Sequence, residues 1–116
     1  MLTPEQLAVE AARAADDKKA LDIRIMDMRE SLGITDYFVV CSGKTERQVR
    51  RIQDSIEKML RERGSKPVRR EGERFARWIL LDYLDFVVHI FREEERSYYD
   101  LEHLWKDVPL VEWLGD

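Results

Sequence analysis

The fold is decided by residues 71–91, Glu-Gly-Glu-Arg-Phe-Ala-Arg-Trp-Ile-Leu-Leu-Asp-Tyr-Leu-Asp-Phe-Val-Val-His-Ile-Phe. Two runs within it, Ala76–Leu81 and Phe86–Phe91, are rich in apolar, β-branched and aromatic residues, a composition that favours strands. The polar break between them, Asp82–Asp85, is short enough for an antiparallel turn. We therefore predict two neighbouring antiparallel strands that form the centre of a sheet.

Three residues of this stretch, Trp78, Asp82 and His89, fit the centre of a sheet poorly. A buried indole N–H needs a hydrogen-bond partner, and burying His or Asp costs free energy. These residues mark either a surface that binds something or a core whose polar groups are satisfied. Composition alone favours the core.

Outside this stretch the sequence predicts helices and strands in a mixed order. They are a helix from Thr3 to about Ala15, strands at Leu21–Ile25 and Tyr37–Cys41, a helix from Thr45 to Gly64, an edge strand within Val68–Phe75 and a helix over Tyr98–Trp105. Thr3 with Gln6, and Thr45 with Gln48, have the spacing of capping boxes, in which each side chain bonds the other residue's backbone N–H. Both helices therefore have a defined start.

The last predicted helix follows a charged connection, Glu93–Arg96, and Ser97 is its expected N-cap. The element order α-β-β-α-β-β-β-α predicts an α/β (α+β-like) fold, a single mixed and partly antiparallel sheet with helices packed on it. We expect one domain over residues 1–116. Residues 107–116 form its C-terminal tail, which is expected to tuck against the body.

The size and composition of the chain exclude several classes of protein. Its 116 residues suit a single domain. Cys41 is the single cysteine, which excludes an internal disulfide framework and fits a reducing compartment. No apolar run approaches the roughly 20 residues that span a membrane, and residues 3–6 begin a helix rather than a signal peptide. We therefore expect a cytoplasmic protein.

Charge is distributed unevenly along the chain. Residues 44–77 carry 12 Lys and Arg against 6 Asp and Glu, whereas the remaining residues carry 8 against 18. A basic segment with acidic flanks favours an anionic neighbour at one face, although a solvated helix and edge strand would look the same. The net charge of −4 is too acidic for an independent nucleic-acid binder that depends on phosphate contacts.

The sequence lacks a convincing nucleophile or metal site. Cys41 ends a strand that should be buried, where a thiol is inert, and nothing in the sequence orients His89 towards it. No His or Cys pair has metal-ligand spacing. Asp82 and Asp85 flank a turn, where Asp is common because it bonds its own backbone. We predict no catalytic residue, no cofactor and no metal.

Residues 42–45, Ser-Gly-Lys-Thr, join a strand to a helix start, where backbone N–H groups can meet an anion. They are not a P-loop, because the second glycine and its spacing are absent. The layout is also that of nucleotidyltransferase folds, but these enzymes need an acidic pair on a strand to hold Mg²⁺. Neither Asp36 nor the following strand supplies such a pair, so this enzyme class is the weaker alternative.

Alternation makes both faces of the two central strands apolar. If Trp78 and Leu80 share one face, Ile79 and Leu81 share the other. Only three helices are available to cover these faces, and the first is rich in alanine. Either the sheet is covered completely or part of one face meets a partner, since exposed aromatic residues and Arg are typical of protein-binding hot spots.

Six motifs occur in an order that is typical of one protein family. They are Thr35–Gly43, Arg47–Val49, Glu71-Gly72, Trp78–Tyr83, Val88–Phe91 and Arg96–Trp105, the last containing Tyr-Tyr-Asp-Leu-Glu-His-Leu-Trp. With these motifs the chain resembles the ribosomal silencing factor (Iojap) family over about residues 5–110. Two positions depart from the family pattern: Leu84, where members often have glycine, and Lys44, which replaces a smaller polar residue.

The resemblance implies a small mixed-sheet protein, similar in shape to nucleotidyltransferases but without their catalysis. It implies a translation repressor that binds the large ribosomal subunit through ribosomal protein L-fourteen and blocks joining of the small subunit when nutrients are scarce. It further implies a homodimer when the chain is free. The basic residues 47–70 are expected to lie towards ribosomal RNA.

The resemblance also assigns residues to the partner-binding surface and its supports. These are Trp78, Asp82, Tyr83, His89, Phe91, Arg96, Tyr98 and Tyr99. Among them, our hypothesis takes Trp78 and Tyr83 as the anchors that contact the partner. The sequence leaves open whether His89 faces the partner or the core.

Overall fold

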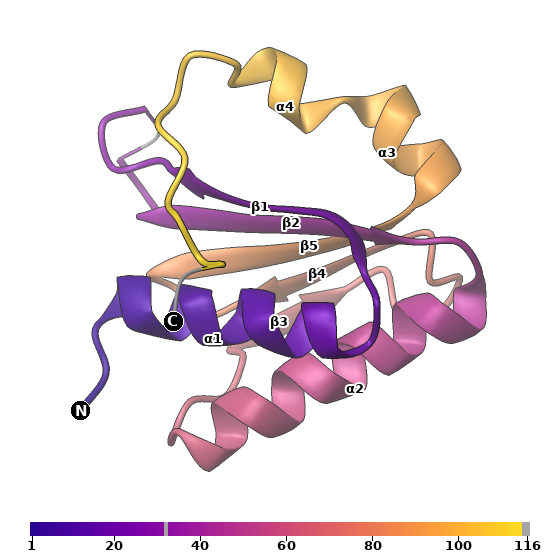
Figure 1. Ribbon diagram of the computed structural model, residues 1–116, viewed down its shortest axis with the longest axis horizontal. Coiled ribbons are helices and arrows are strands. Elements are labelled where there is room, and N and C mark those ends of the chain that lie inside the picture. Colours follow the sequence, from indigo (N-terminus) through magenta and orange to yellow (C-terminus); the bar gives the residue numbers. More distant parts are fainter. Residues whose placement is uncertain (32, 115–116) are drawn as a thin grey trace.

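A single mixed sheet organises the computed structural model, which describes residues 1–31 and 33–114 (Figure 1). Within these residues five strands lie in the order β1-β2-β5-β4-β3. The elements are α1 (Pro4–Asp17), β1 (Leu21–Asp27), β2 (Tyr37–Gly43), α2 (Glu46–Glu62), β3 (Arg69–Glu71), β4 (Trp78–Asp82), β5 (Phe86–Arg92), α3 (Glu93–Tyr99) and α4 (Leu101–Leu104). The predicted fold class is confirmed.

The two predicted central strands form the β4–β5 hairpin. They pair antiparallel, with Trp78 opposite Phe91 and Asp82 opposite Val87, while β5 runs parallel to β2. β4 starts two residues later than predicted, because Ala76 has a φ of +52° and donates its N–H to the carbonyl of Gly72. Residues 72–77 therefore form a loop that leads into the strand.

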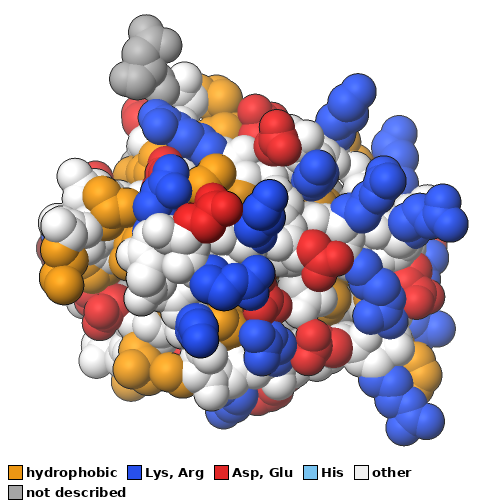
Figure 2. All heavy atoms as spheres, turned by 90° about the horizontal axis from the view of Figure 1, so that it is seen from below, with side chains coloured by type: hydrophobic (Ala, Val, Ile, Leu, Met, Phe, Trp, Pro, Cys, Tyr) orange, Lys and Arg blue, Asp and Glu red, His pale blue; other side chains and the backbone are white. Residues whose placement is uncertain are grey.

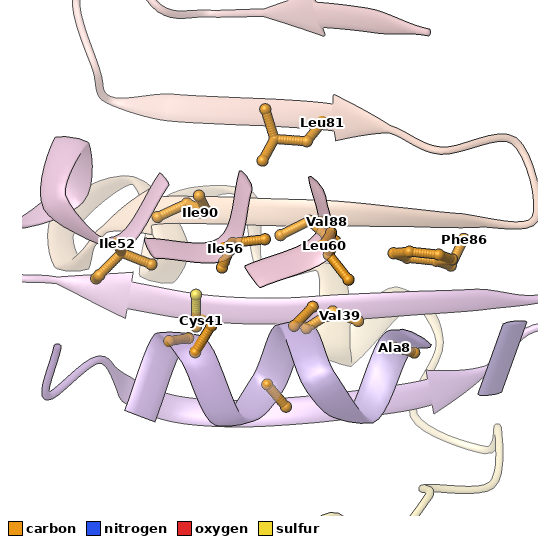
Figure 3. Close-up of a cluster of buried hydrophobic side chains, with 14 of the residues drawn as sticks. Ala8, Val39, Cys41, Ile52, Ile56, Leu60, Leu81, Phe86, Val88 and Ile90 are labelled. Carbon is orange, nitrogen blue, oxygen red and sulfur yellow. The ribbon is translucent and has the colours of Figure 1, made fainter. Parts of the chain in front are cut away.

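Helices α1 and α2 cover one face of the sheet, and α3 and α4 lie over the other (Figure 1). The larger core lies under α1 and α2. In Figure 3 the α2 side chains Ile52, Ile56 and Leu60 lie over Val88 and Ile90 of β5. Alanines of α1 are fully buried in the same core, so this helix approaches the sheet closely, as its thin apolar stripe predicts.

The predicted helix starts are correct, but only one has a complete capping box. Thr3 and Gln6 bond each other's backbone N–H. Thr45 accepts the N–H of Gln48 at 3.1 Å, yet the Gln48 side chain accepts the N–H of Lys44 instead of that of Thr45. Gln48 is drawn away because its amide also bonds the turn after α1, a long-range contact that local spacing does not encode.

The last helix differs from the prediction. Residues 93–96 are not a connection but the first turn of α3, whose N-cap is Arg92, so Ser97 lies inside the helix and is not its cap. Asp100 adopts a left-handed φ of +47° and separates α3 from α4. Its N–H bonds the carbonyl of Arg96, which ends α3 after two turns.

The C-terminal tail covers the β1 edge of the sheet, as the predicted tucking requires. Leu110 forms a bridge with Met26, and Val111 donates its N–H to the carbonyl of Ile25 at 2.8 Å. The indole N–H of Trp113 reaches the carbonyl of Ile23. An edge strand with unpaired backbone groups would invite aggregation, so the tail protects it. Residues 115–116 of the predicted tail lie outside the described residues.

The β4–β5 turn is strained at Leu84, which has a φ of +73°. Asp82 supports the turn by accepting the N–H of Leu84 at 2.8 Å. We expect Leu84→Gly to raise the free energy of unfolding by about 0.5 kcal/mol, because relief of roughly 1–2 kcal/mol of left-handed strain exceeds the added freedom of the unfolded chain. Urea unfolding tests this.

Leu84→Ala is the matched control, since it also removes an exposed side chain but keeps the strained φ. We expect no gain from it. An equal gain in both variants would show that the side chain, and not the backbone, limits the stability of the turn.

Candidate docking surface

Trp78 lies at the centre of an aromatic cluster on the α3 side of the sheet. Its ring stacks on Phe91 at a centroid distance of 4.8 Å and contacts Tyr99 at 4.7 Å. Its indole N–H donates to Nδ1 of His89 at 3.1 Å. The side chain is half-buried, so Trp78 has the hydrogen bond that its N–H needs and still shows part of its ring to the outside.

His89 supports this cluster from below. It is only 4% exposed and packs edge-on against Phe38 at 4.6 Å. Because Nδ1 accepts from Trp78, the neutral ring carries its proton on Nε2, which is buried and has no partner among the described residues. Burial lowers the pKa of His89 to about 4. His89 therefore faces the interior and is a neutral support, which answers the question the sequence left open.

The exposed end of the cluster is formed by α3. Tyr98 is 81% exposed, and its ring meets that of Tyr99 edge-on at 5.1 Å. Tyr99 is exposed too and joins Tyr98 to Trp78. Trp78, Tyr98 and Tyr99 thus form one continuous set of rings at the protein surface, which we call the aromatic surface. Exposed aromatic clusters of this kind are typical of protein-binding sites.

Arg96 holds α3 in place under the aromatic surface. Its guanidinium is buried and donates to the hydroxyl of Ser42 at 2.8 Å and to the carbonyl of Leu21 at 3.2 Å. Two further hydrogen bonds reach one carboxylate oxygen of Glu102. Burial alone would raise the pKa of Glu102, but the bonds from Arg96 lower it overall. Arg96 is therefore a support that ties two strands, α3 and α4 together.

Tyr83 lies on the opposite face of the sheet, and its predicted role as an anchor is wrong. It is only 7% exposed, stacks on Phe86 at 4.8 Å and belongs to the core beneath α2. Burial raises the pKa of its hydroxyl. Asp82 is also not part of the aromatic surface, because it bonds the turn at Leu84 and lies 3.5 Å from Arg69.

The structure thus divides the eight predicted residues. Trp78, Tyr98 and Tyr99 are available to a partner, whereas His89, Phe91 and Arg96 support them, and Asp82 and Tyr83 stabilise the hairpin elsewhere.

The geometry gives little support to a cysteine nucleophile or a metal site, the two kinds of chemistry that the sequence raised. Burial raises the pKa of the Cys41 thiol to about 12, and Cys41 lies in the core under α1 and α2, across the sheet from His89. Across residues 1–31 and 33–114, no three His, Cys, Asp or Glu side chains are placed to hold a metal ion. No helix in this part of the chain is long and apolar enough to cross a membrane.

The Ser-Gly-Lys-Thr loop is not arranged as a phosphate cradle. The hydroxyl of Ser42 accepts from Arg96, and the N–H of Lys44 is bonded to the side chain of Gln48 at 2.7 Å. The N–H of Gln48 is itself capped by Thr45. Two backbone donors that a nucleotide phosphate could use, the N–H groups of Lys44 and Gln48, are therefore already bonded inside the fold.

The basic residues 47–70 do not form a single surface. Several are neutralised by acidic side chains: Arg50 pairs with Glu46 at 3.1 Å, Arg63 with Glu10 at 2.7 Å and Arg70 with Glu57 at 2.6 Å. The spacing of Glu46 and Arg50 on one helix face encodes the first pair, but sequence reasoning missed the other two, because they join residues 53 and 13 positions apart. Arg47 and Arg51 lie instead at one end of α2, beside residues from the turn after α1.

Comparisons with known proteins agree on one family. The family "Ribosomal silencing factor during starvation" matches residues 2–115. A ribosomal silencing factor from Halalkalibacterium halodurans is 41% identical over 98% of this chain and 97% of its own length, and one from Bacillus subtilis is 45% identical over 88% and 86%. A crystal structure of a Chromobacterium violaceum protein matches with a TM-score of 0.87 at 30% identity, covering 98% of this chain and 95% of that one.

Proposed function

Because this chain belongs to the ribosomal silencing factor family, we propose that it is a translation repressor that binds the large ribosomal subunit through ribosomal protein L-fourteen and blocks joining of the small subunit. The observation that supports this proposal is the aromatic surface, which is exposed yet rigidly supported from below. The family description refers to starvation, so we propose that the block operates in the cytoplasm when nutrients are scarce.

Steric blocking requires a surface and no chemistry. A standard interface of roughly 1,600 Å² is enough for tight binding, and a few aromatic anchors supply most of its free energy. Trp78 is held by its bond to His89 and by stacking on Phe91, so little side-chain freedom is lost when it binds. We propose that the chain acts through this surface rather than as an enzyme.

The direct test is co-sedimentation of the chain with purified large and small subunits, followed by a subunit-joining measurement on gradients. We expect binding to the large subunit alone and fewer joined ribosomes as the chain is added. Binding to the small subunit, or joining that is unchanged at saturating chain, would contradict the proposal.

The variant Tyr98→Ala should weaken binding to the large subunit without destabilising the fold. Because Tyr98 is almost fully exposed, its truncation should change the free energy of unfolding by no more than about 0.5 kcal/mol. Binding to the large subunit should weaken by about 2 kcal/mol, or roughly 30-fold in Kd, if Tyr98 is a hot spot. Titration of labelled large subunits with the chain measures this.

Phe75→Ala is the matched control, since Phe75 is also an exposed aromatic residue but lies in the loop before β4, next to Arg74. We expect it to leave binding unchanged. Equal losses in both variants would remove the aromatic surface from the proposal.

We also propose that the free chain forms a homodimer through the aromatic surface, so that dimerisation and ribosome binding compete. Burying exposed rings against a second copy would remove apolar area from water. A mass measurement over a range of concentrations should show that the Tyr98→Ala dimer dissociates at a higher concentration than the dimer of the natural chain, because the variant dimer is weaker.

A further inference from the structure

One corner of the molecule brings together basic residues that are distant in the sequence. Lys18 and Lys19 form the turn after α1, and Lys44 lies in the loop before α2. The side chain of Gln48 joins these two segments. Its amide donates to the carbonyls of Lys19 at 3.0 Å and Lys18 at 3.3 Å, and its carbonyl accepts from the N–H of Lys44 at 2.7 Å. Gln48 therefore fixes the spacing of the two basic segments.

An open hollow of about 450 Å³ lies at this corner. Lys18, Lys19, Arg47 and Arg51 all line it, and Lys44 lines an adjoining hollow together with Lys19. We call Lys18, Lys19, Lys44, Arg47 and Arg51 the basic corner. Figure 2 shows Lys and Arg side chains gathered on its right-hand side, which is the side where Figure 1 shows the end of α1 and the beginning of α2.

Most of this positive charge is not neutralised within the described part of the chain. Nearby Glu46 pairs with Arg50, and Asp17 lies 3.9 Å from Lys18. The other four cations of the basic corner have no ion pair with any described residue, in contrast to Arg63 and Arg70 farther along the chain. Like charges held this close repel one another, and an anion that enters the hollow would relieve that repulsion.

The backbone at Lys19 is strained and carries a positive charge at the edge of the hollow. Lys19 follows the C-cap of α1 and has a φ of +61°, and its N–H and that of Ala20 bond the carbonyls of Asp16 and Ala15, as in a Schellman motif. Glycine is the favoured residue at this position because it has no Cβ. A lysine there keeps a positive charge in the hollow at the expense of backbone strain.

We infer that the basic corner binds the phosphodiester backbone of ribosomal RNA, an inference that rests on the proposed function because it adds a second contact on the same ribosomal subunit. The hollow suits RNA better than an acidic protein, because none of the residues that line it is apolar and protein-binding hot spots need apolar or aromatic anchors. Phosphate contacts need only cations, and Arg and Lys supply most of them.

The net charge of −4 limits how tightly the basic corner can bind RNA without a second contact. Four or five phosphate contacts on an acidic protein give weak, salt-dependent binding that is insufficient alone. Added to a protein–protein contact on the aromatic surface, however, they orient the chain and raise its effective affinity. The basic corner lies at the junction of α1 and α2, whereas the aromatic surface lies on the α3 side of the sheet, so both contacts can form together.

The test is a titration of the full chain with a 12-base-pair RNA duplex of mixed sequence, followed by NMR at several salt concentrations between about 20 and 100 mM. We expect shifts of backbone amides at residues 18–19 and 44–51 and none at Tyr98 or Tyr99. The Kd should rise with salt with a log–log slope of about 3, since each of four phosphate contacts contributes about 0.7–0.9.

Arg47→Gln with Arg51→Gln should lower this slope by about 1.5 and raise the Kd at least about tenfold at 50 mM salt. The matched control is Arg61→Gln with Lys66→Gln, which removes the same charge from exposed positions at the other end of α2. We expect the control to change the Kd by less than about threefold.

The inference is overturned if the duplex does not bind at 20 mM salt, or if the control weakens binding as much as the corner variant. It is also overturned if polyglutamate at the same charge concentration competes as well as RNA, because the corner would then fit an acidic protein. No ribosomal subunit enters this experiment, so its failure leaves the proposed L-fourteen contact intact, and failure of subunit binding leaves this result intact.

Discussion

Gly72→Ala is expected to lower the free energy of unfolding by at least about 3 kcal/mol, a large loss for the addition of one methyl group. A Cβ on Gly72 would lie 1.9 Å from the carbonyl oxygen of Trp78 and 2.9 Å from its carbonyl carbon. These are backbone atoms of the adjacent strand, so the clash is relieved only if the loop moves away from β4. Gly72 also has a φ of +83°, which adds about 1 kcal/mol for any other residue.

Gly64→Ala separates the cost of the clash with Trp78 from the cost of the positive φ. Gly64 has the same φ of +83° at the end of α2, but nothing lies within 4 Å of an added Cβ. We expect this variant to lose only about 1 kcal/mol in the same urea unfolding experiment. Similar losses in the two variants would show that the approach of Gly72 to Trp78 is unimportant. The expected difference matters for function too, because a displaced Trp78 would disturb the aromatic surface.

Local sequence signals predicted most of the fold for physical reasons that are visible in the structure. Alternation in Trp78–Asp82 and Phe86–Arg92 places each side chain on the face that the sequence indicates. The end of α2 is a Schellman motif built on Gly64, with the N–H of Ser65 bonded to the carbonyl of Leu60. Such features depend on neighbours within a few residues, so the sequence encodes them directly.

The errors come from contacts that local patterns do not encode. The start of α3 was missed because Glu93–Arg96 looks like a charged connection, although the acidic side chains suit the first turn of a helix. Arg96 joins this turn to Ser42, which lies 54 residues earlier. The basic corner was predicted only in part: Lys44, Arg47 and Arg51 belong to the basic segment that the sequence indicates, but Lys18 and Lys19 were missed, since Gln48 brings them there through long-range bonds.

Prediction of the candidate site succeeded only in part. The family resemblance selected the right hairpin, but it could not separate residues that face a partner from residues that support them. Alternation alone could have corrected Tyr83, because it shares the parity of Ile79 and Leu81, which face α2, and not that of Trp78. The burial of His89 depends on Phe38 from another strand and was not predictable from its own segment.

Acidification from pH 6.5 to 4 is expected to destabilise the fold by about 3 kcal/mol through His89 alone. Burial lowers its pKa in the folded protein to about 4, below the usual value of about 6.5 that applies to the unfolded chain. Between these values the unfolded state binds a proton that the folded state does not. The contribution of His89 to the free energy of unfolding is therefore fully present above about pH 6.5. It falls by up to about 1.4 kcal/mol per pH unit as the pH approaches 4.

The structure explains why His89 resists protonation. A proton on Nδ1 would place two donors against each other, since Nδ1 accepts the indole N–H of Trp78 at 3.1 Å. The charged ring would also lie among Phe38, Phe91 and Trp78, none of which can neutralise it. Protonation of His89 in the folded chain should therefore release Trp78 and weaken docking, but only near pH 4 and below, where the folded protein itself takes up the proton.

His89→Asn tests this assignment, because the amide oxygen of Asn can replace Nδ1 as the acceptor for Trp78 but does not titrate. The variant will be less stable at pH 7, since a smaller side chain leaves space in the core, so the informative quantity is the slope of stability against pH. Urea unfolding at pH 7, 6, 5 and 4.5 should show a steep decline in the natural chain and a much shallower one in His89→Asn, in which only carboxyls of lowered pKa such as Glu102 still lose stabilisation near pH 4.5. An equal slope in the variant would assign the titration to other groups and would leave the buried His89 without a role in acid sensitivity.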